Sequence, residues 1–327
     1  MKKHLGIYGI DVSKDTIDVV CKKEHCIFEN NIKGFKQFRK IIKDESLCVM
    51  EVTGIYHLPL ATFLYKNDIA VAVVNPLSIK RFSQMYLRRN KTDKADAKMI
   101  ALYGEKQEVD LWIPCEKSIE ESKDISQAME QMVNIRAGLK NKILALKFKK
   151  ASSFLIAEVQ GQIESLSSTI KTLEEKLHEL VKSYDQKLHS NMLSIKGIGA
   201  KTAPLLIITS NGFRDFESAK QLISYYGLAP TETSSGTSIK GKGKISKMGN
   251  PLVRKKLYMC SLQASKHNKA CRDLYQRLLA KGKPKNVALI AVANKLLKIA
   301  YAIAKSGLPY DNEYVSYVQS RQSKEAV

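Results

Sequence analysis

The sequence predicts a mixed α/β domain at the N-terminus, then a long helical hairpin, then a mostly α-helical C-terminal domain. Three patterns carry this prediction. Short apolar runs alternate with helical segments over residues 5–112, an apolar heptad repeat without proline lies within residues 118–190, and residues 191–309 read as mostly helical. A chain of 327 residues is long enough for two or three domains with a sizeable hydrophobic core.

Five strands are expected in the first domain. They are Leu5–Val12, Thr16–Cys21, Cys26–Glu29, Leu47–Val52 and Ile69–Val74. The first two are joined by the short polar turn 13–15, which predicts a β-hairpin. Helices are expected at about Gly34–Lys43, Leu58–Lys66 and Asp93–Tyr103. A hairpin followed by βαβ units makes a mixed sheet.

Four carboxylates in this domain lie where a nuclease of the ribonuclease-H type would hold a metal ion. Asp11 ends the first strand, Glu51 ends a later apolar run, and Asp93 and Asp96 share one face of a helix. Mg²⁺ (or Mn²⁺) prefers oxygen ligands, which suits four acids without histidine. Two bridged ions can activate a nucleophile and stabilise a leaving oxygen in phosphoryl transfer. Taken singly, each acid also fits a turn or a solvated helix face.

The charge of the chain predicts a polyanionic partner. There are 54 Lys and Arg against 32 Asp and Glu, a net charge of +22. An anionic membrane surface is the rival interpretation, but no apolar run approaches the roughly 20 residues of a membrane span, and no signal peptide is expected. Six cysteines are scattered without a Cys-x-x-Cys pair, and Cys21, His25 and Cys26 lack zinc-site spacing. We therefore expect reduced thiols in a cytoplasmic protein.

The stretch 78–91 is predicted to face nucleic acid beside the acids. Its basic residues are Lys80, Arg81, Arg88, Arg89 and Lys91, followed by Lys94 and Lys98, and it also carries Phe82 and Tyr86. Cations of this kind hold the phosphate backbone rather than perform chemistry.

The middle of the chain carries four heptads of apolar positions. They are Ile156, Val159, Ile163, Leu166, Ile170, Leu173, Leu177, Leu180 and Tyr184, spaced alternately three and four residues apart. This repeat predicts a helical hairpin that acts as a coiled-coil spacer and oligomer contact. The alternative is an amphipathic helix packed on its own domain.

Two glycine-containing segments of the C-terminal half are candidate phosphate contacts. The turn with Gly197 and Gly199 resembles half of a helix-hairpin-helix, in which backbone N–H groups approach a phosphate. A tight turn between packed helices explains it equally well. The segment 233–250 combines Ser234 and Ser235 with glycines and with Lys240, Lys242, Lys244 and Lys247. No acid occurs from 233 to 272, where ten Lys or Arg residues lie. A serine there could attack a phosphodiester, although composition alone favours a loop that grips phosphate.

Motifs along nearly the whole chain occur in the order in which one known family carries them. They are Ile-Asp-Val-Ser-Lys at 10–14, Glu-Val-Thr-Gly-Ile-Tyr at 51–56, Asn-Pro at 75–76, Lys-Thr-Asp-Lys-Ala-Asp-Ala at 91–97, Ile-Lys-Gly-Ile-Gly at 195–199, Phe-Glu-Ser-Ala-Lys-Gln-Leu at 216–222, Tyr-Gly-Leu-Ala-Pro at 226–230, Ser-Ser-Gly at 234–236 and Ile-Ser-Lys-Met-Gly-Asn at 245–250, with Arg254 after them. With these motifs the chain resembles the DEDD insertion-sequence transposases of the IS-one-ten group, which are related to the Piv-type invertases.

The resemblance implies a domain plan and a set of site residues. It implies an RNase H-like (RuvC-like) domain over 1–112, a coiled-coil spacer over 113–190, a C-terminal transposase domain over 191–310 and a polar tail over 311–327. It implies Asp11, Glu51, Asp93 and Asp96 as the metal tetrad. It also implies a nucleophilic serine, which we place at Ser235, with Ser234 as the adjacent alternative.

The resemblance further implies covalent strand exchange on DNA. Serine attack would give a phosphoserine link, followed by strand exchange and religation of donor and target DNA. Members of this family are guided by a structured bridge RNA and work as dimers that pair into tetramers. The alternative is a metal-dependent nuclease or Holliday-junction resolvase of the RuvC-like class, without covalent serine chemistry.

Overall fold

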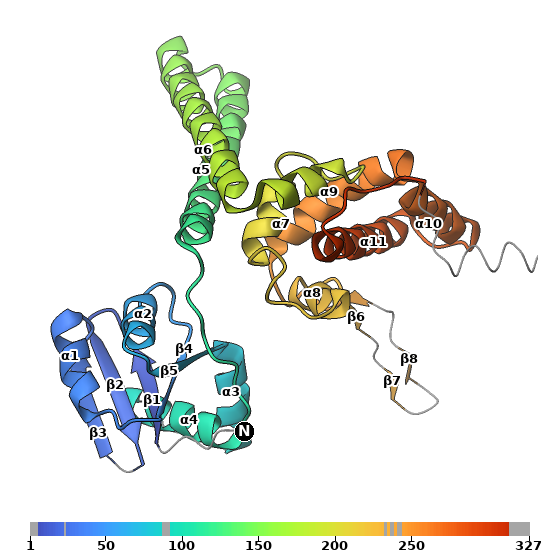
Figure 1. Cartoon of the computed structure of the whole chain (residues 1–327). Coiled ribbons are helices and arrows are strands. Elements are labelled where there is room, and N and C mark those ends of the chain that lie inside the picture. The colour runs from blue at the N-terminus through green and yellow to red at the C-terminus, as the bar shows by residue number, and fades with distance from the viewer. Residues whose placement is uncertain are drawn as a thin grey trace, which may run out of the picture. The chain divides into compact units, whose positions relative to one another are not determined.

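The computed structural model describes residues 6–22, 24–86, 92–231, 234–235, 239–240 and 244–313. The chain divides into two compact units between Pro114 and Cys115 (Figure 1). The predicted helical hairpin and the predicted C-terminal domain both belong to the second unit. All six cysteines are free thiols.

Unit 1 is built on a five-stranded mixed sheet in the order β3-β2-β1-β4-β5. Its strands are β1 (Ile7–Val12), β2 (Thr16–Cys21), β3 (Glu24–Glu29), β4 (Leu47–Glu51) and β5 (Ala70–Val74). The first three form an antiparallel meander, while β1, β4 and β5 pair in parallel. All five predicted strands are present, so the mixed α/β prediction is confirmed. The architecture is compatible with an RNase H-like domain.

Helices cover both faces of this sheet. They are α1 (Ile32–Ile41), α2 (Leu58–Lys66), α3 (Pro76–Met85) and α4 (Asp93–Lys106). The core with α1 and α2 contains Tyr8 and Ile10 of β1, whereas Val49 of β4 packs with α3 and α4 on the other face. Asn75 caps α3 through its side chain and Pro76 occupies the first turn, which explains the Asn-Pro motif.

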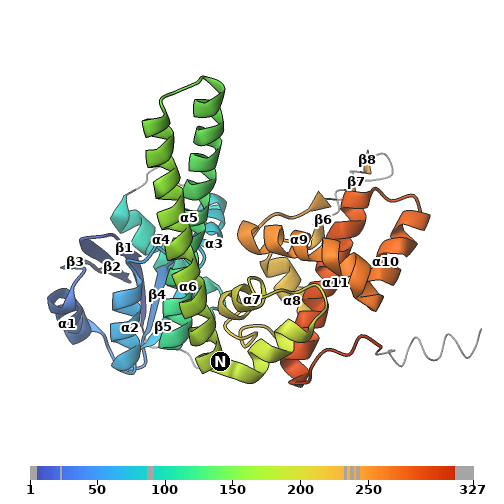
Figure 2. The ribbon, with the colours of Figure 1, turned by 90° about the horizontal axis from the view of Figure 1, so that it is seen from above.

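Unit 2 begins with two long helices, α5 (Lys117–Phe148) and α6 (Ser153–Ser194), which pack side by side as a hairpin (Figure 1, Figure 2). Three heptad positions, Ile163, Ile170 and Leu177, are buried, and the other six are half-buried. The backbone of α6 breaks at Asp185, directly after the last heptad position. The hairpin agrees with the sequence, while its role as a coiled coil and oligomer contact stays a prediction.

Among the described residues of unit 2, five further helices follow α6. They are α7 (Ala203–Thr209), α8 (Ala219–Tyr225), α9 (Pro251–His267), α10 (Lys269–Ala280) and α11 (Lys285–Ser306). By length and composition α11 could cross a membrane, which differs from our expectation that no apolar run comes close. Its residues Val292, Leu296 and Leu297 lie in the core of unit 2, which accounts for much of its apolar character.

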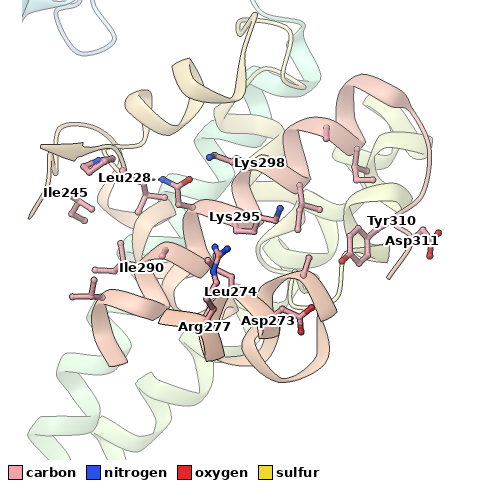
Figure 3. A pocket seen from close by; sticks show the side chains of 18 of the residues that line it. Leu228, Ile245, Asp273, Leu274, Arg277, Ile290, Lys295, Lys298, Tyr310 and Asp311 are labelled. Atoms are coloured by element: carbon pink, nitrogen blue, oxygen red, sulfur yellow. Dashed lines mark hydrogen bonds between the residues drawn. The ribbon is translucent and has the colours of Figure 1, made fainter. Parts of the chain in front are cut away.

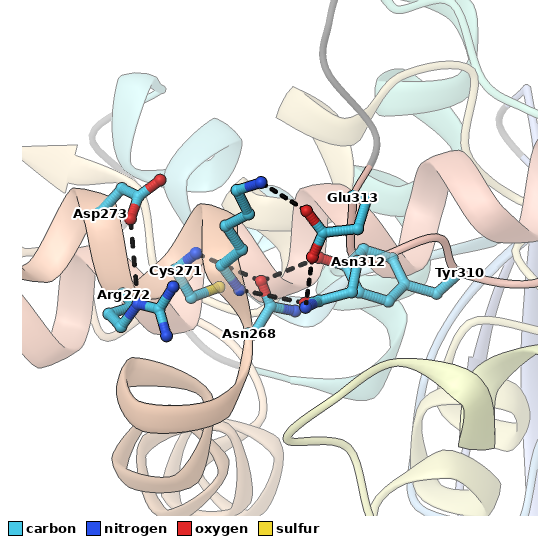
Figure 4. Close-up of polar contacts among 8 residues, drawn as sticks. Asn268, Cys271, Arg272, Asp273, Tyr310, Asn312 and Glu313 are labelled. Atoms are coloured by element: carbon cyan, nitrogen blue, oxygen red, sulfur yellow. Dashed lines mark hydrogen bonds and ion pairs between the residues drawn. The ribbon is translucent and has the colours of Figure 1, made fainter.

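One buried asparagine, Asn268, holds the joint between α9 and α10 (Figure 4). Its Oδ1 accepts hydrogen bonds from Cys271 N at 3.2 Å and from Tyr310 OH at 2.9 Å. Its Nδ2 donates to Lys196 O at 3.2 Å. The side chain therefore ties together α10, the segment after α11 and the turn after α6.

We expect Asn268→Ala to lower the free energy of unfolding of unit 2 by about 2–4 kcal/mol, because it removes an N-cap and leaves buried groups without partners. Tyr310→Phe removes one hydrogen bond and should cost about 1 kcal/mol. Urea titrations followed by circular dichroism measure both losses. The single tryptophan, Trp112, lies in unit 1, so its fluorescence transition should not move. Equal losses in the two variants would contradict the role given to Asn268.

Candidate functional site

The sheet register places Asp11 and Glu51 on the face that α4 covers. A Cβ atom on Gly9 would lie 2.2 Å from Ala97 O and from Ala101 N of α4, so Gly9 faces this helix. Side chains alternate along a strand, and Asp11 therefore lies on the same face. Gly9 pairs with Val49 in the parallel neighbour β4, which puts Glu51 on that face too.

The first turn of α4 brings the other two predicted acids to this face of unit 1. Thr92 caps the helix, because its Oγ1 accepts from Ala95 N at 3.2 Å. Asp93 and Asp96 lie in the first turn, where the helix dipole stabilises negative charge. Asp93 is exposed and Asp96 is half-buried.

The charges of the other three acids act on Asp11. The pKa of Asp11 is raised to about 6, first by burial and then by the negative charges of Glu51, Asp96 and Asp93, in that order. Burial therefore has the largest effect on Asp11, and the negative charges of the three other acids add to it.

The donor chemistry of these acids fits a hard divalent cation such as Mg²⁺. Across the residues that the structure describes, however, no three His, Cys, Asp or Glu side chains are grouped closely enough to hold one ion. The four predicted acids therefore lie on one face of unit 1 without forming a grouped metal site there, and their role as metal ligands stays a prediction.

The sequence reasoning missed one acid beside this set. Asp18 is the direct cross-strand partner of Asp11, is buried, and contributes to the raised pKa of Asp11. Its Oδ1 lies 2.7 Å from His25 Nε2, so the histidine satisfies it. The sequence shows Asp18 as an acid in a largely apolar strand, but it does not show which residue of β1 Asp18 pairs with.

The basic residues predicted to face nucleic acid in unit 1 are only partly described. Lys80 and Arg81 are exposed on α3 and Lys94 is exposed on α4, whereas Arg88, Arg89 and Lys91 lie outside the described residues. The prediction fails for Phe82, which is buried. Its ring packs on Tyr103 at 5.2 Å and on Tyr86 at 5.1 Å between centroids, so its side chain is part of the interior of unit 1.

In unit 2, Ser234 and Ser235 lie on a narrow β-ribbon. At its foot β6 (Pro230–Thr231) pairs with β9 (Lys244–Ile245), and farther along β7 (Ser234–Ser235) pairs with β8 (Ile239–Lys240). The backbone register sets Ser234 opposite Lys240 and Ser235 opposite Ile239. The predicted loop is thus held by two short antiparallel pairings.

The foot of the ribbon is fixed by two glycines that interlock. Gly227 has φ +71°, and a Cβ atom there would lie 2.3 Å from Met248 O. Gly249 has φ +122°, and its Cβ atom would lie 2.0 Å from Tyr225 O. The motifs at 226–230 and 245–250 therefore pack backbone against backbone, which requires glycine in both.

The remaining candidate nucleic-acid contacts of unit 2 differ in their surroundings. Lys244 and Lys247 are exposed, Lys240 lies in β8, and Lys242 falls outside the described residues. Arg254 Nη1 donates to Tyr226 O and to Gly249 O, both at 3.0 Å, so this arginine braces the foot of the ribbon.

The two glycines of the Gly-Ile-Gly turn differ, because Gly197 is closely packed and Gly199 faces open space. Gly197 has φ +108°, and a Cβ atom there would lie 2.7 Å from Ala264 Cβ, so close packing on α9 requires it. Gly199 is exposed with no atom within 4 Å of its Cβ position. Of the two, Gly199 is the residue at which a phosphate could approach, and that role stays a prediction.

A cavity of about 1420 Å³ lies in unit 2 beside the ribbon foot (Figure 3). Pro230, Lys244 and Ile245 line it from the ribbon, and α10, α11 and the segment 308–311 supply the other walls. Its lining is mostly apolar, with cations such as Arg277 and Lys298 among the residues that surround it.

Comparison with known proteins finds family matches in both units of the chain. A family model of DEDD transposases of the IS110 type matches residues 8–146, and the model described as "Transposase IS116/IS110/IS902 family" matches residues 189–276. The acids lie in the first match and the serines in the second.

Curated relatives match along nearly the whole chain. The pilin gene-inverting protein of Moraxella bovis is 32% identical over 317 residues, which cover 93% of this chain and 97% of the relative. The protein of the same name from Moraxella lacunata is 31% identical with the same coverage. The transposase for insertion sequence element IS1111A of Coxiella burnetii is 24% identical over 92% of this chain and 90% of its own. This chain therefore belongs to the IS110 family of transposases and is an enzyme of DNA recombination.

Proposed function

We propose that this chain moves an insertion sequence by cleaving and rejoining DNA with four metal-binding carboxylates and a serine nucleophile. The carboxylates are Asp11, Glu51, Asp93 and Asp96, and the nucleophile is Ser235. The observation that carries the proposal is the placement of these acids, since Asp11 and Glu51 lie on the sheet face that α4 covers and Asp93 and Asp96 lie in the first turn of α4. The raised pKa of Asp11 agrees with this placement.

The carboxylates would bind and orient divalent metal, and the serine would carry the covalent step. Mg²⁺ or Mn²⁺ held by the carboxylates would supply Lewis-acid stabilisation of the charge on the phosphate oxygens. Ser235 Oγ attacks phosphorus and loses its proton, while the bond from phosphorus to one DNA oxygen breaks and that oxygen gains a proton. In religation the hydroxyl of the exchanged strand attacks the phosphoserine and releases the serine.

The interlocked ribbon foot supports the assignment of the serine. A nucleophile must be presented in a reproducible place, and the Gly227–Met248 and Gly249–Tyr225 contacts hold both ends of the serine segment. Cations at the foot, Lys244 and Lys247, suit a phosphate that approaches the ribbon.

Guide RNA and oligomeric assembly belong to the same proposal. The net charge of +22 suits an enzyme that holds both donor and target DNA and a structured bridge RNA in the bacterial cytoplasm. Half-buried heptad positions on the hairpin, and exposed Phe148 and Phe154 near its turn, suit pairing with a second copy into dimers and tetramers. The relatives named for gene inversion and transposition support recombination as the outcome.

We expect Ser235→Ala and Asp11→Ala each to abolish recombination between donor and target plasmids in cells, with the native flanking DNA supplied, and Ser234→Ala to remain active. A protein–DNA adduct that survives denaturing electrophoresis should form in wild type and be absent in Ser235→Ala. If Ser235→Ala still recombines and Ser234→Ala does not, the nucleophile is the neighbouring serine. Cleavage that needs the acids but neither serine would instead support the metal-dependent nuclease.

A further inference from the structure

Apolar side chains are exposed on the turn that directly follows Glu51. Val52 is 41% exposed, Ile55 71% and Tyr56 40%. Single exposed apolar residues are common, but three within five positions beside a carboxylate cluster form a local apolar surface. The turn therefore offers contact area that no other part of unit 1 covers among the described residues.

Two backbone hydrogen bonds hold this turn. Tyr56 N donates to Thr53 O at 3.0 Å, and Leu58 N donates to Ile55 O at 3.2 Å. His57 directly follows and is only 5% exposed, so its imidazole anchors the turn in the domain. A backbone that is already held in place loses little conformational freedom on binding, which favours a contact surface.

Asn30 ties this turn to the loop that follows Asp11. Its Nδ2 donates to Tyr56 O at 3.2 Å and to Ser13 O at 2.7 Å. Ser13 is two residues beyond Asp11, and the turn directly follows Glu51. These hydrogen bonds therefore fix the position of the turn relative to Asp11 and Glu51.

We propose that Ile55 and Tyr56 form a wedge that packs against a nucleobase next to the phosphate that is cleaved. The proposal rests on the proposed function, because it takes the adjacent carboxylates as the cleavage site. DNA is the occupant because this chain recombines DNA, and because base faces are the largest apolar surfaces that nucleic acid offers beside its phosphates. Stacking on an aromatic ring does not depend on base identity, and inserted apolar side chains unstack neighbouring bases.

The wedge predicts a local change in the DNA that fluorescence can detect. The probe is a duplex of the element end and its flanking DNA with 2-aminopurine placed in turn at each position beside the cleaved phosphate. Full-length protein with its guide RNA should raise the fluorescence at one position through unstacking. Tyr56→Ala and Ile55→Ala should each remove this rise, whereas Tyr56→Phe should retain it.

The variants that lose the fluorescence rise should also bind the DNA duplex more weakly. Loss of one aromatic–base contact corresponds to about 5- to 100-fold weaker DNA binding in Tyr56→Ala. The control is Ile32→Ala on α1, since Ile32 is 58% exposed on another element and should leave both readouts unchanged. Ile55→Ala alters a largely exposed side chain, so it keeps the test valid if Tyr56→Ala folds poorly.

Failure of the wedge can be told apart from failure of the proposed function. Unchanged fluorescence and affinity in both variants would overturn the wedge while Asp11-dependent recombination persisted. A change in sedimentation without a change in fluorescence would overturn it in favour of a protein interface. If Asp11→Ala recombines normally, the carboxylate site itself is wrong, and the wedge falls with it.

Discussion

Asp11→Asn should make the metal-free protein more stable and at the same time abolish recombination. The ionised carboxylate of Asp11 is partly buried beside Glu51, Asp96 and Asp93, and these surroundings raise its pKa to about 6. At neutral pH the fold therefore carries an unfavourable charge that the amide lacks. Trp112 lies in unit 1 and packs on Tyr65, so its fluorescence reports the unfolding of this unit.

The stability that Asp11→Asn gains over wild type should increase as the pH rises. In the unfolded chain an aspartate has a pKa of ~3.9, so it loses its proton at a lower pH than Asp11 does in the folded protein. Wild-type stability therefore falls as pH rises from about 4 to about 6, and the full cost is present above pH 6. Because the side chain is partly exposed, solvent screening reduces this cost to about 1–2 kcal/mol. Asp11→Asn should not show this fall.

Divalent metal should make wild type more stable than Asp11→Asn, the reverse of the order without metal. Mn²⁺ or Mg²⁺ offsets the repulsion in wild type, so it should raise the melting temperature of wild type and much less that of Asp11→Asn. The control is Asp15→Asn, which makes the same charge change in the exposed turn between β1 and β2. If Asp15→Asn gains as much stability as Asp11→Asn, the effect comes from net charge and not from the carboxylate cluster.

The strands of unit 1 and the end positions of Asp11 and Glu51 could be predicted because alternation and strand length are local properties. The polar turn between β1 and β2 was equally visible, since its residues are adjacent in the chain. Phe82 was misassigned because an aromatic residue among cations looks the same whether it faces solvent or core. Only the packing of α3 on α4 separates the two cases.

Features that depend on pairing register or on distant backbone could not be predicted. Asp18 becomes a neighbour of Asp11 through the β1–β2 register, which shifts with the length of the turn. The contact of Gly227 with Met248 joins residues 21 positions apart. The sequence around Gly227 or around Gly249 does not show which distant backbone the glycine contacts. The break at Asp185 also lies inside a continuous helical pattern, where only packing shows that the helix changes direction.

Gly9→Ala should be among the most damaging single-methyl changes in unit 1. The added Cβ would lie 2.2 Å from Ala97 O and Ala101 N, which are backbone atoms of α4 and cannot turn aside as a side chain can. We expect the free energy of unfolding of unit 1 to fall by about 3 kcal/mol or more, because the helix must move away from the sheet. Urea titration followed by Trp112 fluorescence measures this loss.

The same substitution also tests how the carboxylates come together. Since Asp93 and Asp96 begin α4, displacement of this helix should weaken the stabilisation by Mn²⁺ and abolish recombination even in the fraction that folds. Gly161→Ala is the matched control, because no atom lies within 4 Å of its Cβ position inside α6. It should raise stability by roughly 0.5–1 kcal/mol, since alanine favours helix over glycine. If Gly9→Ala keeps metal-dependent stabilisation and recombination, the close contact of β1 with α4 does not position the acids, and their convergence needs another cause.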